Sequence, residues 1–102
     1  MKSLPLTPEI EAIAGRVIWF EKSPQAVADP IRFLAYVMTY GDDADMRNIR
    51  QHLSDDELRE ALDKAPAGIF DPRSWAYWNL KLGRYPTPPM PERAIVAAES
   101  TK

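Results

Sequence analysis

The chain has 102 residues, of which 45% are hydrophobic and 27% are charged. This length fits one small domain, and the composition is that of a folded protein rather than a disordered one. Cysteine is absent, which excludes disulfides, thiolate catalysis and cysteine-bearing zinc sites, and a cytoplasmic protein is expected. The net charge of −2 disfavours nucleic acid as a partner, because domains that neutralise phosphates are usually basic.

The sequence gives no indication of a membrane protein. Residues 1–8 contain one lysine and no apolar run, unlike a secretory signal peptide. No window approaches the roughly eighteen consecutive apolar residues that a membrane span requires. We expect no contact with a membrane.

Prolines mark the predicted helix starts. Four of the ten prolines follow a Ser, Thr or Asp near a predicted helix start, namely Pro8, Pro24, Pro30 and Pro72. Such a side chain accepts hydrogen bonds from the free amides of a helix start, and proline fits the first helical position. Apolar residues at helical spacing predict helices over residues 8–20, 30–40 and 72–82, whereas residues 23–28 are expected to form a short turn.

The segment over residues 30–40 is predicted to be the central helix. Apolar side chains surround nearly its whole circumference, and only Arg32 and Thr39 interrupt them. A helix of this kind is normally packed on several sides. Gly41 follows it and is expected to occupy the usual C-terminal glycine position.

Two short helices are predicted over residues 43–53 and 55–65. Ser54 and Glu57 match a capping box, in which each satisfies the other's backbone amide. Asp42, Asp43 and Asp45 are attributed to helix initiation, because the spacing closes no calcium loop and no phosphate-binding loop accompanies them. The only histidine, His52, is interpreted as a helix-end residue, so no catalytic residue, metal or cofactor is expected.

The helix pair within residues 43–65 has the spacing of a helix-turn-helix, which suggests a DNA-binding autoregulator as the alternative function. Residues 42–63, however, carry eight acidic residues against three arginines. Such a surface is a poor fit to a major groove and suits a basic protein partner better. Asp55, Asp56 and Glu60 are therefore predicted to contact a partner.

The strongest signal is the aromatic segment over residues 73–82. As a helix it places Trp75, Trp78 and Leu82 on one face, with Ala76, Tyr77 and Leu80 on the other, near Arg73. Either the core covers this helix all round, or the second face binds a protein, since Trp, Tyr and Arg anchor interfaces out of proportion to their number. The predicted binding face comprises Arg73, Tyr77 and Leu80, extended by Arg84, Tyr85 and the prolines after them as an arm.

The motifs resemble those of a known family. They include Trp19-Phe20, Tyr40-Gly41, the helix with Glu57-Leu58 and Ala61-Leu62, and Asp71-Pro72-Arg73-Ser74-Trp75, followed by Trp78 and Leu82-Gly83. Over residues 17–83 the chain is similar to small helical proteins encoded beside AbiEii-type nucleotidyltransferase toxins, which are treated as antitoxins. The resemblance implies that the chain does no chemistry and binds such a toxin directly.

We therefore expect an all-α compact bundle of about five short helices over residues 1–83. Residues 84–102 are expected to form a Pro-rich extended arm and a mobile tail. The leading hypothesis is a non-catalytic protein-interaction module, an antitoxin that neutralises a nucleotidyltransferase-like toxin. A homodimer that covers the aromatic face with itself is a structural alternative.

Overall fold

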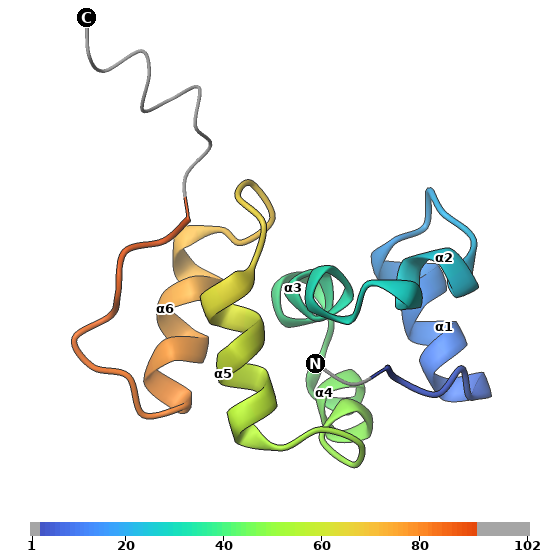
Figure 1. Ribbon diagram of the computed structural model, residues 1–102, viewed down its shortest axis with the longest axis horizontal. Helices are drawn as coiled ribbons and strands as arrows, with labels where there is room; N and C mark the ends of the chain where they lie inside the picture. The colour runs from blue at the N-terminus through green and yellow to red at the C-terminus, as the bar shows by residue number, and fades with distance from the viewer. Residues whose placement is uncertain (1–2, 92–102) are drawn as a thin grey trace, which may run out of the picture.

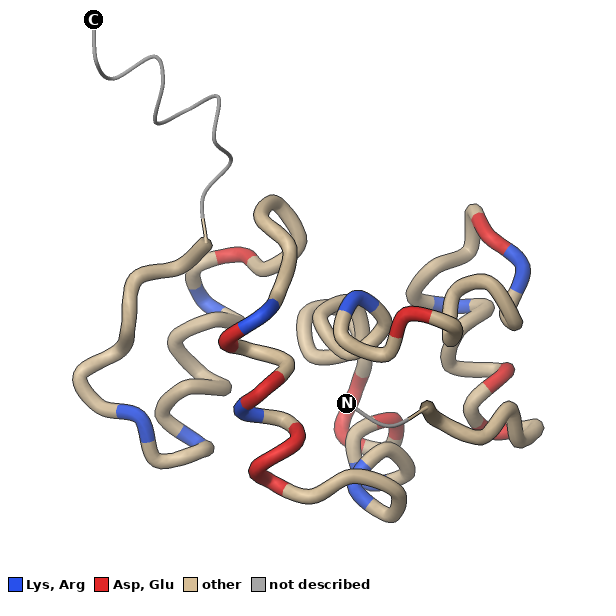
Figure 2. Tube along the Cα trace, in the orientation of Figure 1, with Lys and Arg blue, Asp and Glu red and all other residues tan. Residues whose placement is uncertain are grey.

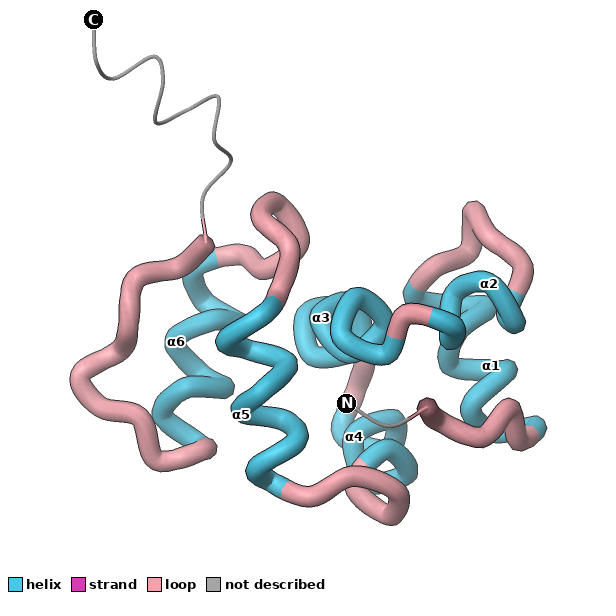
Figure 3. Tube along the Cα trace, in the orientation of Figure 1, coloured by secondary structure: helices cyan, strands magenta, loops and turns pink. Residues whose placement is uncertain are grey.

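The computed structural model describes residues 3–91 and is all-helical over that range, with six helices joined by loops (Figure 1, Figure 3). The expected all-α bundle is confirmed. The helices are α1 (Pro8–Val17), α2 (Ser23–Ala28), α3 (Pro30–Tyr40), α4 (Asp43–Ile49), α5 (Asp55–Lys64) and α6 (Pro72–Lys81). The sixth helix arises because residues 23–28, expected as a turn, form the short helix α2 with Pro24 in its first turn.

Side-chain caps begin most of these helices. Thr7, Asp29 and Asp71 each accept a hydrogen bond from a backbone amide of the helix that follows, and proline is the next residue in each case. The capping box of Ser54 and Glu57 at α5 is present as predicted. A second capping box joins Asp42 to Asp45 at α4, so these acids initiate a helix, as the sequence indicated. Local hydrogen bonds thus fix where the chain turns.

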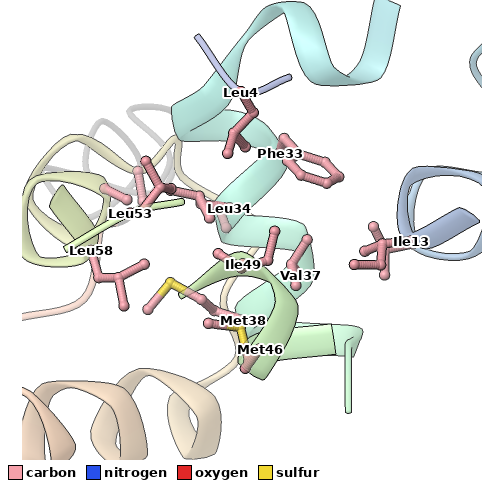
Figure 4. Packing of buried hydrophobic residues seen from close by; sticks show 14 of the residues in the cluster. Leu4, Ile13, Phe33, Leu34, Val37, Met38, Met46, Ile49, Leu53 and Leu58 are labelled. Atoms are coloured by element: carbon pink, nitrogen blue, oxygen red, sulfur yellow. The ribbon is translucent and has the colours of Figure 1, made fainter. Parts of the chain in front are cut away.

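Helix α3 lies at the centre of the bundle and packs against each of the other five helices. Its buried side chains are Phe33, Leu34, Ala35, Val37 and Met38. They meet side chains from α1, α4 and α5, including Ile13, Met46, Ile49 and Leu58 (Figure 4). The prediction of a central helix is confirmed, except that Tyr36 is half-buried and Tyr40 is 64% exposed, so one strip of α3 faces solvent.

Several predicted helices are longer than the observed ones. The helix expected over residues 8–20 ends at Val17, and those expected to end at residues 53, 65 and 82 end at Ile49, Lys64 and Lys81. After α1 and α4 the chain continues in turns that place Ile18 and Leu53 in the core. The apolar spacing therefore predicted burial correctly, but burial does not require that the helix continue.

Gly41 does not have the left-handed conformation expected of a C-terminal glycine. It has a φ of −78°, so the backbone is extended and not left-handed. A Cβ atom here would lie 2.6 Å from the carbonyl oxygen of Val37 and 3.1 Å from Oδ2 of Asp45. The glycine is thus required because α3 and α4 approach closely.

Arg16 and Asp45 join α1 to α4 beside this glycine. The two guanidinium nitrogens of Arg16 donate to the two carboxylate oxygens of Asp45 at 3.0 and 2.5 Å. Asp45 is 4% exposed, and its Oδ2 also accepts from the amide of Asp42. These bonds hold the pKa of Asp45 below its ordinary value, because all of them favour the charged carboxylate.

Gly41→Ala is predicted to lower the free energy of unfolding by about 1–3 kcal/mol, because the new methyl group collides with backbone of α3. Gly15→Ala is the matched control, since Gly15 is exposed in α1 and has no atom within 4 Å of its Cβ position. There the same change is expected to stabilise by about 0.5–1 kcal/mol. Urea denaturation of both variants checks the opposite signs, and equal effects would contradict the close approach.

Asp45→Asn is predicted to cost about 1–2 kcal/mol at neutral pH, because the amide keeps the size of the side chain but loses the ion pair with Arg16. The folded-state pKa of Asp45 lies below its ordinary value of 3.8. Its contribution is therefore complete above that value and is lost as the pH falls through the folded-state pKa. Thermal melts of both proteins from pH 7 to pH 2 should show the gap between their melting temperatures narrowing once the pH falls below 3.8. A gap that stays constant to pH 2 would contradict this role.

Candidate functional site

The predicted aromatic face of α6 is exposed in the structure. Trp75 and Trp78 are buried, whereas Tyr77 is 52% and Leu80 is 62% exposed. Trp78 is fixed by a hydrogen bond of 2.8 Å from its Nε1 to the carbonyl oxygen of Met38 on α3. The division of α6 into a buried and an exposed face therefore agrees with the sequence prediction, and the alternative of a helix covered all round does not.

A groove runs between α4 and α6. One hollow of about 370 Å³ is lined by Asp43, Met46, Arg47, Arg50, Tyr77, Trp78 and Lys81. A second hollow of about 240 Å³ shares Asp43, Met46, Tyr77 and Trp78 with it and continues to Met38, Gly41, Asp42, Arg73 and Ser74. Both α4 and α6 pack on α3, so the groove is open between them and closed beneath.

The groove has an apolar floor and charged rims. Met38, Met46 and Trp78 are each no more than 7% exposed and form the floor. The ammonium of Lys81 lies 5.8 Å from the ring centroid of Tyr77, which itself packs edge-on against Trp78 at 5.2 Å. The site therefore offers aromatic and apolar contacts within reach of positive charge.

The acidic residues predicted to bind a partner lie on α5 and already have intramolecular partners. Arg50 donates to Asp55 at 2.6 Å, Arg59 donates to Asp56 at 2.7 Å, and the ammonium of Lys64 lies 3.0 Å from Glu60. Glu60 has its pKa lowered by the hydrogen bond with Lys64. Figure 2 shows acidic positions along α5 and basic but no acidic positions on α6. The two helices thus present surfaces of different charge.

The segment over residues 84–91, expected as an extended arm, is bonded to the helical domain. Both guanidinium NH groups of Arg84 donate to Asp63, and its amide donates to the carbonyl oxygen of Asn79 at 2.7 Å. Further along, Nε1 of Trp75 donates to the carbonyl oxygen of Pro88 at 2.8 Å. These bonds hold the segment beside α6 (Figure 1). Tyr85 remains 81% exposed, and residues 92–102, expected as a tail, lie outside the described residues.

A second aromatic surface lies where α1 meets α3 and was not predicted as a site. Trp19 is 77% and Phe20 is 52% exposed. Their rings pack edge-on, as do those of Phe20 and Tyr36, and the ring of Tyr40 lies tilted beside that of Tyr36. The guanidinium of Arg32 lies 5.4 Å from the ring centroid of Tyr36 and is paired with Glu21. Sequence spacing indicated that Trp19 points away from the core. It did not indicate that the rings of Tyr36 and Tyr40 lie close to those of Trp19 and Phe20.

The described residues contain no cluster of metal-ligating side chains. Among residues 3–91 there is no group of three His, Cys, Asp or Glu side chains that could hold a metal ion. His52 lies in the turn after α4, where its amide donates to the carbonyl oxygen of Ile49. No helix of this range is long and apolar enough to cross a bilayer. The arrangement is suited to binding through exposed rings and charges.

Sequence reasoning missed the α4 half of the groove. Arg47 and Arg50 look like ordinary cations near a helix end, and Met46 looks like a core residue. The groove exists only because α4 and α6, separated by α5 in the chain, pack on the same helix. The one local signal was the pair Tyr77 and Lys81, which are four residues apart and so share a helix face.

We compared the chain with protein-family models, with curated proteins and with solved structures, and none of them matches it.

Trp78→Ala is predicted to cost about 3–5 kcal/mol, because it opens a cavity under the groove and removes the hydrogen bond to Met38. A domain of this size has little more stability than that, so the variant should be largely unfolded. Tyr77→Ala removes a half-exposed ring and should cost about 1 kcal/mol or less. Circular dichroism melts distinguish them, and a similar loss in both would contradict the assignment of buried and exposed faces.

Proposed function

We propose that this chain is a non-catalytic protein-interaction module whose binding surface is the exposed face of α6 together with the groove beside it. The observation that carries the proposal is the exposure of Tyr77 and Leu80 on a helix whose other face is fully used by the core. Half-buried or exposed aromatic side chains on a rigid helix are typical anchors of protein interfaces. Arg73, on the same face, supplies a further side chain of the type enriched at interfaces.

The partner we propose is a nucleotidyltransferase-like toxin, and the chain would act as its cytoplasmic antitoxin. This assignment is supported by the resemblance of residues 17–83 to the helical proteins encoded beside such toxins. An antitoxin that works by direct binding needs an exposed anchor, which Tyr77 and Leu80 would supply. The acidic face of α5 would meet a basic surface of the toxin.

Tyr77→Ala and Tyr85→Ala are each predicted to weaken the complex with a nucleotidyltransferase-like protein encoded beside this gene by about 1–2 kcal/mol, or roughly tenfold. Both rings are exposed, so the variants should keep the melting temperature of the parent protein to within a few degrees. Binding is measured by titration calorimetry on purified proteins.

Phe20→Ala is the matched control, since Phe20 is 52% exposed, as is Tyr77, but lies on the other aromatic surface. Wild-type affinity in both tyrosine variants would overturn the proposed face. A loss of affinity in the control alone would show that the interface is the surface around Trp19.

Light scattering on the free chain tests the homodimer, and a dimer that is abolished by Tyr77→Ala would identify a second copy as the occupant of this face.

A further inference from the structure

The groove between α4 and α6 is directional. The hollow of about 240 Å³ contains Asp42 and Arg73, from the starts of the two helices, whereas the hollow of about 370 Å³ contains Arg50 and Lys81, from their ends. The helices therefore run in the same general direction along the two sides. Since a helix advances about 1.5 Å per residue, ten residues of α6 make a groove side of roughly 15 Å. This length suits two or three turns of a bound helix.

Positive charge dominates this groove in a chain whose net charge is −2. The lining includes Arg47, Arg50, Arg73 and Lys81 against the carboxylates of Asp42 and Asp43. Arg50 is paired with Asp55, whereas within the described residues neither Arg47 nor Arg73 has a hydrogen bond or ion pair from its side chain. Within the same residues the ammonium of Lys81 lies near the Tyr77 ring and has no hydrogen bond or ion pair. These three cations are available to an external ligand.

The character of the groove favours a peptide over a phosphate group. Arg47, Arg50 and Lys81 surround the C-terminal ends of α4 and α6, where helix carbonyls carry partial negative charge and repel a compact dianion. The floor of Met46 and Trp78 is apolar, so it would remove water from a phosphate without offering a hydrogen-bond donor in its place. Leucine-like side chains match that floor, and carboxylates on flexible stems can reach the cations at the rim.

The geometry points to an acidic amphipathic helix of a partner protein as the ligand of the α4–α6 groove. Its apolar side chains would pack on Met46, Tyr77 and Trp78, and its carboxylates would pair with Arg47 and Lys81. Arg73 would receive a further carboxylate at the opposite end. This inference rests on the proposed function only in assigning the groove to a protein partner, and it adds the charge and shape of the segment that binds.

The test uses the full chain and three fluorescein-labelled probes at one ionic strength. The first is a helical peptide with leucines on one face and glutamates on the other, the second has lysines in place of the glutamates, and the third is a thymidine oligonucleotide. We expect the glutamate peptide to bind most tightly, measured by fluorescence anisotropy. Its binding should shift the amide resonances of Arg47, Tyr77 and Lys81, and it should weaken at higher salt.

Arg47→Glu combined with Lys81→Glu is expected to weaken the glutamate peptide about tenfold, because both unpaired cations become repulsive. Asp43→Asn should strengthen it about twofold, since a carboxylate leaves the rim of the groove. Lys22→Glu makes the same kind of charge reversal in the exposed connection between α1 and α2 and should leave the affinity unchanged. Because the Arg47 and Lys81 variant should weaken binding and the Asp43 variant should strengthen it, the pair distinguishes an electrostatic effect from a loss of structure.

Equal or tighter binding of the lysine peptide or the oligonucleotide would overturn the inference, as would resonance shifts confined to other helices. Retention of full affinity in the Arg47 and Lys81 double variant would do the same. These results do not depend on the toxin. If the glutamate peptide binds in the groove while the chain does not bind the toxin, the antitoxin assignment fails alone. If the chain binds the toxin and the tyrosine variants weaken that complex, but the glutamate peptide does not bind, only the acidic-helix ligand is removed.

Discussion

Burial of α3 is the constraint on which the rest of the structure depends. This eleven-residue helix contacts all five other helices, and its side chains Phe33, Leu34 and Val37 are fully buried. A chain of 102 residues can bury one helix on several sides, because the other helices are then needed to form the layer that covers it. Each outer helix therefore buries one face and leaves the other to solvent. An aromatic residue on an outer face stays exposed.

This constraint explains why α6 presents two different faces. Trp75 and Trp78 share the side toward the core, and each indole NH finds a backbone carbonyl, one from Pro88 and one from Met38. Tyr77 and Leu80 lie on the opposite side of α6, where no further helix of the described chain covers them. The segment after α6 does not cover them either, and its Arg84 is paired with Asp63 of α5. The exposed face is thus a consequence of how the chain is routed.

Local chemistry made much of this fold predictable. Proline and the cap residues before it located the starts of α1, α3 and α6, and the capping box located α5. Apolar spacing also assigned the buried face of α6. What local patterns could not supply was the close approach at Gly41, the long-range pair of Arg16 with Asp45, and the meeting of α4 with α6. The last two depend on residues far apart in the chain, which a single sequence does not relate, and the first depends on how tightly the chain turns between α3 and α4.

Net charge was also a poor guide to the surface. Acidic residues gather on α5, where Asp55 and Asp56 are paired with arginines of the same domain. Those pairs are exposed and contribute little to stability, so their arginines can exchange partners at small cost. The cations of the α4–α6 groove, in contrast, stand over an apolar floor where water is partly excluded. A charge held beside apolar surface interacts more strongly than one in bulk water. In the proposed interface the few cations of the groove would therefore contribute more to recognition than the paired acids of α5.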